Sequence, residues 1–278
     1  MILRDSVHAA GRVLTRGLLH PQWREFAPMS WTYLRLYLLG KRLTERRELA
    51  TLRSLITPGM VIADIGANAG FYALEMAECV GRSGRVLAFE PDPFNFGLLD
   101  RRARSAPLGN VDAHQLALGD EAGQAVLYCS AYNRADNRIG QSHEEKHVES
   151  YTVQVRTLDE FAASKGLAKI DALKIDVQGA EARVLRGAAH TLAAGLQWLW
   201  VEFSPDHLRG AGVDPAGFLQ NLAGYGMDVF EVTDAAELRP LTDYAEHTRK
   251  MGAGYGDVVL LARAAASRRL RATPRDGA

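Results

Sequence analysis

The stretch VIADIGANAGFYALEMA, residues 61–77, holds the residue types that most directly suggest chemistry. An apolar run ends at Asp64, the small residues Gly66–Gly70 follow, and a helical pattern begins at Phe71. In an α/β sheet, ligands bind beyond the carboxyl ends of the strands, where this turn is expected. Glycine lets a ligand approach the main chain, and the N-terminus of a helix favours an anionic group. Because Asp64 adds the opposite charge, the turn suits a zwitterionic head such as that of an amino acid.

A second acid follows at the end of the next apolar run, AFEPDP, residues 88–93. Glu90 lies about 20 residues after the glycine turn, where an acid can accept hydrogen bonds from both hydroxyls of a ribose. An amino acid at Asp64 and a ribose at Glu90 together outline S-adenosylmethionine. A dinucleotide is the rival, but its G-x-G-x-x-G turn has a glycine where this chain has Asn68. The sequence therefore favours S-adenosylmethionine.

Short apolar runs alternate with helical patterns from Thr57 onward, which predicts a doubly wound, mostly parallel α/β sheet. The expected strands are Val61–Asp64, Arg85–Glu90, Val111–Leu118, Ala172–Asp176, Trp198–Phe203, Asp228–Val232 and Asp257–Ala262. The expected helices are Phe71–Val80, Pro93–Ser105, Ala180–Ala194 and Pro215–Gly224. The runs AVLYCS and SYTVQVRTL predict a two-strand insertion around a polar loop, residues 131–149.

The two ends of the chain differ from this pattern. Residues 1–50 carry nine Lys/Arg against four Asp/Glu and predict an N-terminal helical extension. Its apolar stripe, which would dock on the main domain, cover a substrate or lie on a membrane, comprises Trp31, Leu34, Tyr37 and Leu38. Residues 264–278 predict a basic, disordered tail.

The composition is that of an ordinary soluble globular protein. The chain has 278 residues, 47% of them apolar and 24% charged, with a formal net charge of zero. No basic face points to nucleic acid as a partner, and no run of roughly 18 apolar residues predicts an integral membrane segment. Cys79 and Cys129 lack disulfide or metal spacing and are expected to be reduced thiols. We expect a cytoplasmic protein, for which an oligomer is possible.

Five motifs between Leu52 and Ala262 carry a family resemblance. They are DIGANAGFYAL, AFEPDPFNFGLL, NVDAHQLALGD, VRTLDEF and LKIDVQGAEARVLRGA. In this order they resemble the FkbM family of S-adenosylmethionine-dependent methyltransferases. The resemblance implies a class I methyltransferase (Rossmann-like) fold for residues 51–263, with a seven-stranded sheet that ends in an antiparallel hairpin. It also implies O-methylation of a hydroxyl on a sugar or natural product.

The same resemblance implies a set of cofactor-binding residues. Glu90 would hold the ribose, Pro91 and Asn95 would shape the adenine side, and Asp176 would lie near the sulfonium. The methionine part would be surrounded by Asp64, Gly66, Ala67, Asn68, Gly70 and Tyr72. The adenine edge would be lined by Gln115, Leu116 and Ala117, although many relatives have Asn at the position of Gln115.

The motif LKIDVQGAE contains the leading catalytic candidate. Lys174 and Asp176 point to the same face of a strand because side chains alternate. Asp176 would orient the cofactor's amino group, steer the substrate hydroxyl or act as base. The other candidate bases are Glu202 at the end of the next strand and His207 just beyond it. A structural ion pair between Lys174 and Glu181 is also expected.

The polar loop supplies the substrate candidates. Asn133, Asn137 and Arg138 in NRADNRIG would bind a polar acceptor or the cofactor's carboxylate, or would instead stabilise a turn. His143 opens HEEKH, which matches the zinc motif H-E-x-x-H but lacks its helical context. We expect a solvated loop with a substrate contact at His143. A divalent metal is possible but not indicated.

These observations favour an S-adenosylmethionine-dependent O-methyltransferase with a small hydroxylated acceptor. Three alternatives remain open: an N- or C-methyltransferase on the same fold, a catalytically inactive cofactor-binding interaction module, and a zinc hydrolase that uses HEEKH.

Overall fold

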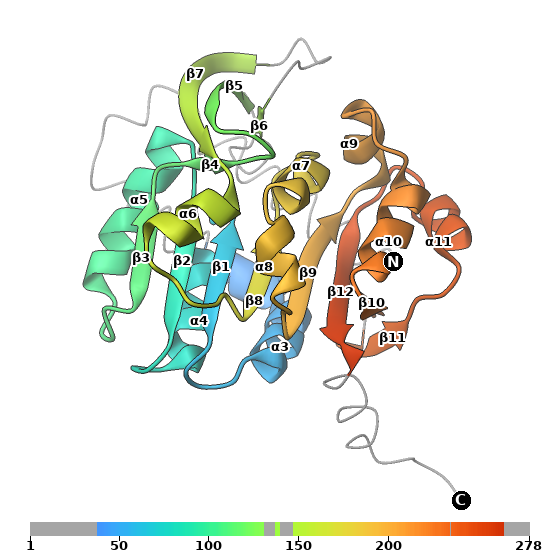
Figure 1. Cartoon of the computed structure of the whole chain (residues 1–278), viewed down its shortest axis with the longest axis horizontal. Helices are drawn as coiled ribbons and strands as arrows, with labels where there is room; N and C mark the ends of the chain where they lie inside the picture. Colours follow the sequence, from blue (N-terminus) through green and yellow to red (C-terminus); the bar gives the residue numbers. More distant parts are fainter. Residues whose placement is uncertain (1–37, 131–136, 140–146, 234, 264–278) are drawn as a thin grey trace, which may run out of the picture.

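The computed structural model describes residues 38–130, 137–139, 147–233 and 235–263. Its main sheet has eight strands in the order β11-β10-β12-β9-β8-β1-β2-β3 (Figure 1). The central strands β3, β2, β1, β8 and β9 are parallel, whereas β12 runs antiparallel to both of its neighbours. The bounds are β1 (Val61–Ile65), β2 (Arg85–Phe89), β3 (Val111–His114), β8 (Ala172–Ile175), β9 (Trp198–Phe203), β10 (Met227–Val232), β11 (Leu238–Pro240) and β12 (Gly256–Ala262).

The predicted doubly wound sheet is confirmed, and six of the seven expected strands are present as single strands. The structure adds one short edge strand, β11, which pairs antiparallel with β10. The expected strand Val111–Leu118 is divided into β3 and β4 (Ala117–Leu118), which belong to different sheets. From β1 the chain moves outward to β2 and β3, then returns to place β8 on the other side of β1. The strand order therefore reverses between β1 and β8, which is where such sheets bind ligands.

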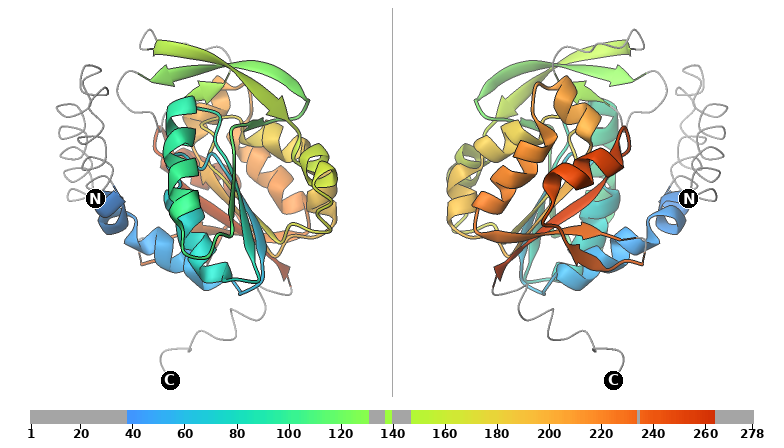
Figure 2. Two further views of the ribbon diagram at one scale, coloured as in Figure 1. Left: turned by 90° about the vertical axis from the view of Figure 1, so that its left-hand side faces the viewer. Right: turned by 90° about the vertical axis from the view of Figure 1, so that its right-hand side faces the viewer.

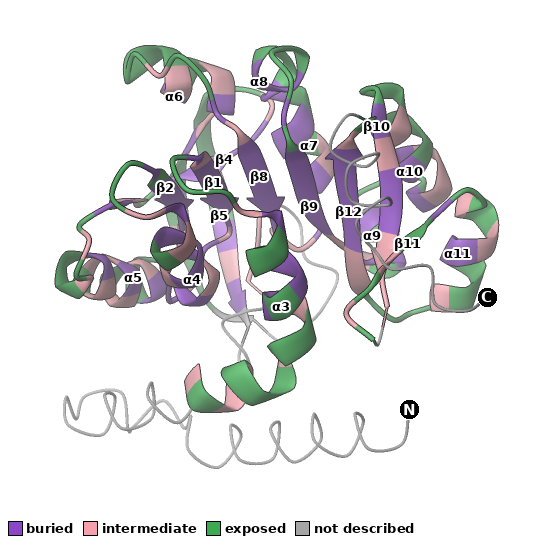
Figure 3. Ribbon diagram, turned by 90° about the horizontal axis from the view of Figure 1, so that it is seen from below, coloured by how far each residue is buried: buried purple, intermediate pink, exposed green. Residues whose placement is uncertain are grey.

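Helices cover both faces of the sheet (Figure 3). On one face, α3 (Arg46–Leu55), α4 (Phe71–Val80) and α5 (Pro93–Ser105) bury Leu52, Met76 and Leu99 against the strands. The other face is covered by α6 (Leu158–Ser164), α7 (Glu181–Arg186), α8 (Ala189–Ala193), α9 (Pro205–Gly210) and α10 (Pro215–Gly224). A further helix, α11 (Tyr244–Met251), packs against α10. The result is a three-layer α/β/α arrangement.

Helix ends follow local capping chemistry. The bounds expected for α4, α5 and α10 are confirmed, and aspartates cap α5 and α10 through Asp92 and Asp214. The single helix expected over Ala180–Ala194 is instead two, α7 and α8, which meet at Gly187. A methyl group at Gly187 would lie 1.9 Å from the carbonyl oxygen of Gly119, so the chain must pass this point without a side chain.

The expected two-strand insertion is present and forms part of a larger sheet. Its two strands, β5 (Gly123–Ser130) and β7 (His147–Arg156), pair antiparallel. β4 and β6 (Arg138–Ile139) extend them into a second sheet of order β4-β7-β5-β6. This second sheet lies over the carboxyl ends of the central strands (Figures 1 and 2). It is therefore placed to cover whatever binds there.

The N-terminal extension is part of the main domain where the structure describes it. Helix α3 runs through the expected boundary at residues 50 and 51, and Leu49, Leu52 and Leu55 are buried. Residues 38–44 are also mostly helical, and Leu38 is half-buried. The other members of the expected apolar stripe, and residues 264–278, lie outside the described residues. No helix in the described part of the chain has the length and apolarity needed to cross a membrane.

We predict that Gly187→Ala lowers the free energy of unfolding by about 1–3 kcal/mol, because the added methyl group has no space beside the Gly119 carbonyl. Chemical denaturation followed by circular dichroism measures this. The matched control is Gly97→Ala within α5, where a methyl group would meet nothing within 4 Å. That control should be neutral or stabilising by about 0.5–1 kcal/mol. Wild-type stability in Gly187→Ala would contradict the close approach.

Candidate active site

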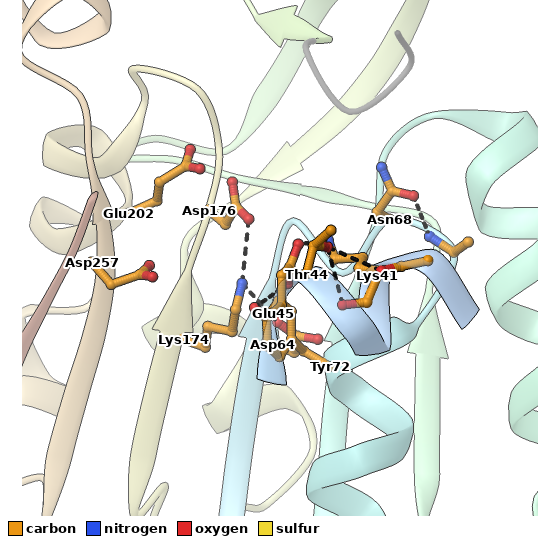
Figure 4. Close-up of polar contacts among 12 residues, drawn as sticks. Lys41, Thr44, Glu45, Asp64, Asn68, Tyr72, Lys174, Asp176, Glu202 and Asp257 are labelled. Carbon is orange, nitrogen blue, oxygen red and sulfur yellow. Dashed lines mark hydrogen bonds and ion pairs between the residues drawn. The ribbon is translucent and has the colours of Figure 1, made fainter. Parts of the chain in front are cut away.

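Asp64 lies at the reversal point of the sheet, on β1 opposite Lys174 of β8. Its side chain is fully buried, and neither carboxylate oxygen has a hydrogen-bond partner among the described residues. The nearest cation is the Lys174 ammonium, 4.0 Å from Asp64 Oδ1 (Figure 4). Burial raises the pKa of Asp64 to about 6, although Lys174 opposes the shift. A buried acid without hydrogen bonds is costly, so it is a strong indication of a missing ligand.

The glycine turn packs directly against the end of β8. Gly66 has φ +84°, and a methyl group there would lie 1.9 Å from the backbone oxygen of Asp176. The amides of Gly66 and Ala67 both donate to the Phe89 carbonyl, which ties the turn to β2. Gly70 has φ +77°, and a methyl group there would lie 2.7 Å from Leu99 Cδ1 of α5. The turn is therefore held between three strands and two helices.

Asn68 and Glu90 are connected directly. Asn68 adopts φ 51°, and its amide donates to Glu90 Oε2 at 2.8 Å. Glu90 Oε1 accepts from the Asp92 amide at 2.9 Å. Burial raises the pKa of Glu90 to about 8. Each carboxylate oxygen has lone pairs left for a ribose hydroxyl, so the position of Glu90 agrees with its predicted role.

The remaining expected cofactor residues continue along the same edge of the sheet. Pro91, which directly follows Glu90, is half-buried. Asn95, in the first turn of α5, is buried. Gln115 is exposed, and Leu116 and Ala117 are buried between β3 and β4. The structure thus places the residues expected around the methionine part at the end of β1, those expected at the ribose at the end of β2, and those expected at the adenine edge at the end of β3. Their contact with a cofactor stays a prediction.

On the other side of Asp64, acids from neighbouring strands come together around Lys174. Lys174 Nζ lies 3.4 Å from Asp176 Oδ2. Gln178 Nε2 donates to Asp176 Oδ1 at 3.1 Å and to Glu202 Oε2 at 2.6 Å. Glu202 in turn lies opposite Asp257 in the pairing of β9 with β12 (Figure 4).

These acids differ in protonation. Burial opposes the ionisation of Asp176, but the charges of Lys174 and Lys41 and the hydrogen bonds from Glu202 and Gln178 together outweigh it, so the pKa of Asp176 is lowered. Burial and the Asp176 charge raise the pKa of Glu202 well above its ordinary value. Burial also raises the pKa of Asp257 to about 7, and Trp200 Nε1 donates to it at 2.8 Å. Asp176 is therefore ionised at neutral pH, whereas Glu202 holds a proton more readily than an ordinary glutamate does.

Asp257 is a site residue that was not predicted, and Glu181 does not have its predicted partner. Asp257 begins a predicted strand, and only the β9–β12 register places it beside Glu202. The expected ion pair between Lys174 and Glu181 is wrong, because Lys174 pairs with Asp64 and Asp176 instead. Glu181 Oε1 accepts from the Gly179 amide at 3.0 Å, so this acid holds the loop after Asp176.

Two loop candidates have protein partners. Arg138 Nη2 lies 2.9 Å from Nε2 of His207, which connects β6 to α9 above the site. Asn137 Nδ2 donates to Asp92 Oδ2 at 2.6 Å and so anchors the second sheet next to Glu90. Asn133 and His143 lie outside the described residues.

The zinc motif does not have the helical context it needs at its second histidine. His147 is the first residue of strand β7 and pairs with Ser130, whereas H-E-x-x-H requires both histidines on one helical face. In the part of the chain that the structure describes, no group of three or more His, Cys, Asp or Glu is arranged to hold a metal ion.

The charges of the site fit S-adenosylmethionine. Asp64 is a buried carboxylate that suits an ammonium, and the carboxyl groups of Asp176 and Glu202 lie close enough to share the Gln178 donor. A cationic ligand is what such an arrangement of acids favours.

Comparison with known proteins agrees with this geometry. The family model described as Methyltransferase FkbM domain matches residues 64–239. The 2-O-methyltransferase NoeI of Sinorhizobium fredii is 29% identical over 218 residues, which cover 71% of this chain and 83% of NoeI. The 31-O-demethyl-FK506 methyltransferase FkbM of Streptomyces tacrolimicus is 32% identical over 160 residues, 48% of this chain and 60% of that protein.

Other matches are shorter or more distant. Four of the curated relatives are matched over only 57% to 60% of their own length. The crystal structure of Methyltransferase FkbM from Methylobacillus flagellatus KT has a TM-score of 0.46 at 14% identity, over 74% of this chain and 44% of that one. Since the domain match extends over more than half of its residues, the chain belongs to the FkbM family of S-adenosylmethionine-dependent methyltransferases.

Proposed function

We propose that this protein transfers a methyl group from S-adenosylmethionine to a hydroxyl of a sugar or natural product. The observation that carries the proposal is Asp64, a buried carboxylate without a hydrogen-bond partner among the described residues, beside the Gly66 turn and one strand away from Glu90. The acceptor class is supported by relatives named as a 2-O-methyltransferase, a 31-O-demethyl-FK506 methyltransferase and a hexuronic acid methyltransferase.

One set of residues would hold the cofactor, and another set would prepare the acceptor. Asp64 binds the ammonium of the amino-acid part, and Glu90 accepts from the ribose hydroxyls. When bound, the cofactor supplies an electrophilic methyl group. Its transfer needs the acceptor oxygen aligned with the bond that breaks, so positioning provides much of the acceleration.

Asp176 is the best placed of the three candidate bases. It is ionised at neutral pH and lies at the reversal point with Asp64. Glu202, whose pKa is raised by burial and by the Asp176 charge, shares the Gln178 hydrogen-bond donor with Asp176. Arg138 can only donate hydrogen bonds, so the His207 Nε2 that it contacts must be an unprotonated acceptor. The hydrogen bond from Arg138 therefore opposes protonation of His207 Nε2.

The second sheet would provide the acceptor side. Arg138 and His207 lie where β6 meets α9, and the Gly179 loop that follows Asp176 packs against the His207 backbone. Arg138 is a hydrogen-bond donor that a polar acceptor can share. Asn137 serves to anchor this sheet through Asp92 rather than to bind the acceptor directly.

An N- or C-methyltransferase is the second candidate, because the fold does not determine the acceptor atom. An inactive cofactor-binding module would keep Asp64 and Glu90 but show no turnover with any acceptor.

Calorimetric titration with S-adenosylhomocysteine, and with NAD as control, tests the cofactor. We expect micromolar binding of the first ligand and none of the second. Binding of NAD alone, or of neither ligand, would contradict the proposal. A panel of hydroxylated and amine acceptors, followed by mass spectrometry of the products, then distinguishes O- from N-methylation.

Binding of S-adenosylhomocysteine should depend on the ionisation of Asp64. The pKa of Asp64 is about 6 without ligand, so the carboxylate that attracts an ammonium is present above that pH and lost below it. We predict that affinity falls by roughly tenfold per pH unit below pH 6. Asp64→Asn should bind weakly and lose this slope. Asp100→Asn, which changes a surface carboxyl paired with Arg104, should keep it. An unchanged slope in Asp64→Asn would reject the assignment.

Asp176→Asn should lower kcat by about 10²–10⁴-fold, the usual contribution of a positioned base, with a smaller effect on cofactor affinity. Because the pKa of Asp176 is already low, wild-type kcat should have no rising limb near pH 6.5. A kcat–pH profile of wild type and His207→Gln checks this. A limb near pH 6.5 that disappears in His207→Gln would assign the base to His207 instead.

A further inference from the structure

The helical residues 38–45 lie beside the site, although the family match begins only at residue 64. Figure 4 shows Lys41, Thr44 and Glu45 on this helical segment next to Asp64 and Tyr72. The segment thus reaches the end of the site where the amino acid of the cofactor is expected.

Lys41 and Glu45 contact the first turn of α4, directly after the glycine turn. The Tyr72 hydroxyl donates to Glu45 Oε2, and Lys41 Nζ lies 3.3 Å from Glu45 Oε1. The same ammonium is 5.2 Å from the ring centroids of both Phe71 and Tyr72. Lys174 Nζ lies 4.5 Å from the Tyr72 centroid. Tyr72 is therefore in contact with both lysines.

A buried acid keeps this segment in place. Glu75 of α4 has a side chain only 4% exposed, and it accepts from both Arg42 and Arg53. The Arg42 Nη2–Glu75 Oε1 distance is 2.7 Å. Because two arginines on either side of Glu45 converge on one carboxylate, residues 41–45 have a defined position against α4. These contacts fix the position of Lys41 beside the first turn of α4.

Lys174, the other lysine of the site, already has two acidic partners. The Lys174 side chain is 4% exposed and lies between Asp64 and Asp176. An amino-acid ligand brings a carboxylate together with its ammonium, and Asp64 is suited only to the ammonium. The Lys41 side chain is 19% exposed, so a ligand can reach it. It also lies at the N-terminus of α4, where the helix itself favours an anion.

We propose that Lys41 binds the carboxylate of the cofactor's methionine part, and that Glu45 and Tyr72 hold its ammonium in position. Residues 38–45 are then a wall of the cofactor site rather than an appendage. The inference rests on the proposed use of S-adenosylmethionine. A lysine and a carboxylate form a charge-assisted hydrogen bond, which is stronger than one between neutral groups.

Two ligands separate this role from a general effect on the site. S-adenosylhomocysteine carries the carboxylate, whereas S-adenosyl-3-thiopropylamine is the same molecule without it. Calorimetric titration of the full chain with each ligand compares wild type, Lys41→Met and Lys41→Arg. Methionine keeps the apolar stem on the Phe71 and Tyr72 rings. The control is Lys250→Met on α11, because Lys250 Nζ lies 3.3 Å from Glu246 Oε1 in an i,i+4 pair with the same spacing as Lys41 and Glu45 but the reverse order.

We expect Lys41→Met to bind S-adenosylhomocysteine about 10- to 100-fold more weakly, as the loss of a charged hydrogen bond implies. Its affinity for the thiopropylamine should stay within about threefold of wild type. Lys41→Arg should retain most of the affinity, and Lys250→Met all of it. Wild-type binding of S-adenosylhomocysteine by Lys41→Met would overturn the inference. Equal losses for both ligands would overturn it too, because Lys41 would then act on the shape of the site. A wild-type chain that binds neither ligand would instead reject the proposed function.

Discussion

The pairing of Lys174 with Asp64 and Asp176 is the interaction on which the rest of the site depends. One ammonium lies between two carboxylates at the reversal point of the sheet, where water is excluded from Lys174 and Asp64. Removing one partner from such a group leaves the others buried and uncompensated, which is strongly destabilising. Lys41 adds a second positive charge that acts on both acids. The pKa of Asp64 stays raised by burial, so a cationic ligand would stabilise its ionised form.

The backbone around this group has little freedom. Gly66 has to be glycine because the end of β8 passes where a side chain would start. The same turn is tied to β2 through the Phe89 carbonyl, and Asn68 is tied to Glu90. The amino-acid end and the ribose end of the site are therefore connected by covalent chain and hydrogen bonds across three adjacent strands. Their spacing is set before a ligand arrives.

Burial makes the site sensitive to pH. The pKa is raised to about 6 for Asp64, about 7 for Asp257 and about 8 for Glu90. The folded protein thus keeps protons that the unfolded chain loses near pH 4. As these groups ionise with rising pH, the folded state is destabilised relative to the unfolded one. A bound cation offsets that cost, which links cofactor binding to the stability of the sheet.

The local parts of this protein followed from its sequence alone. Most strands and the ends of α4, α5 and α10 are short-range patterns of apolar spacing and caps, so they were predicted correctly, whereas the expected strand Val111–Leu118 is divided between two sheets. The tertiary structure decided which distant residues meet. Strand register places Asp257 opposite Glu202. Lys174 pairs with Asp64 and not with Glu181. Residues that precede the family match bring Lys41 and Glu45 into contact with Tyr72. No local signal encodes these contacts, because they depend on how separate elements pack across the sheet.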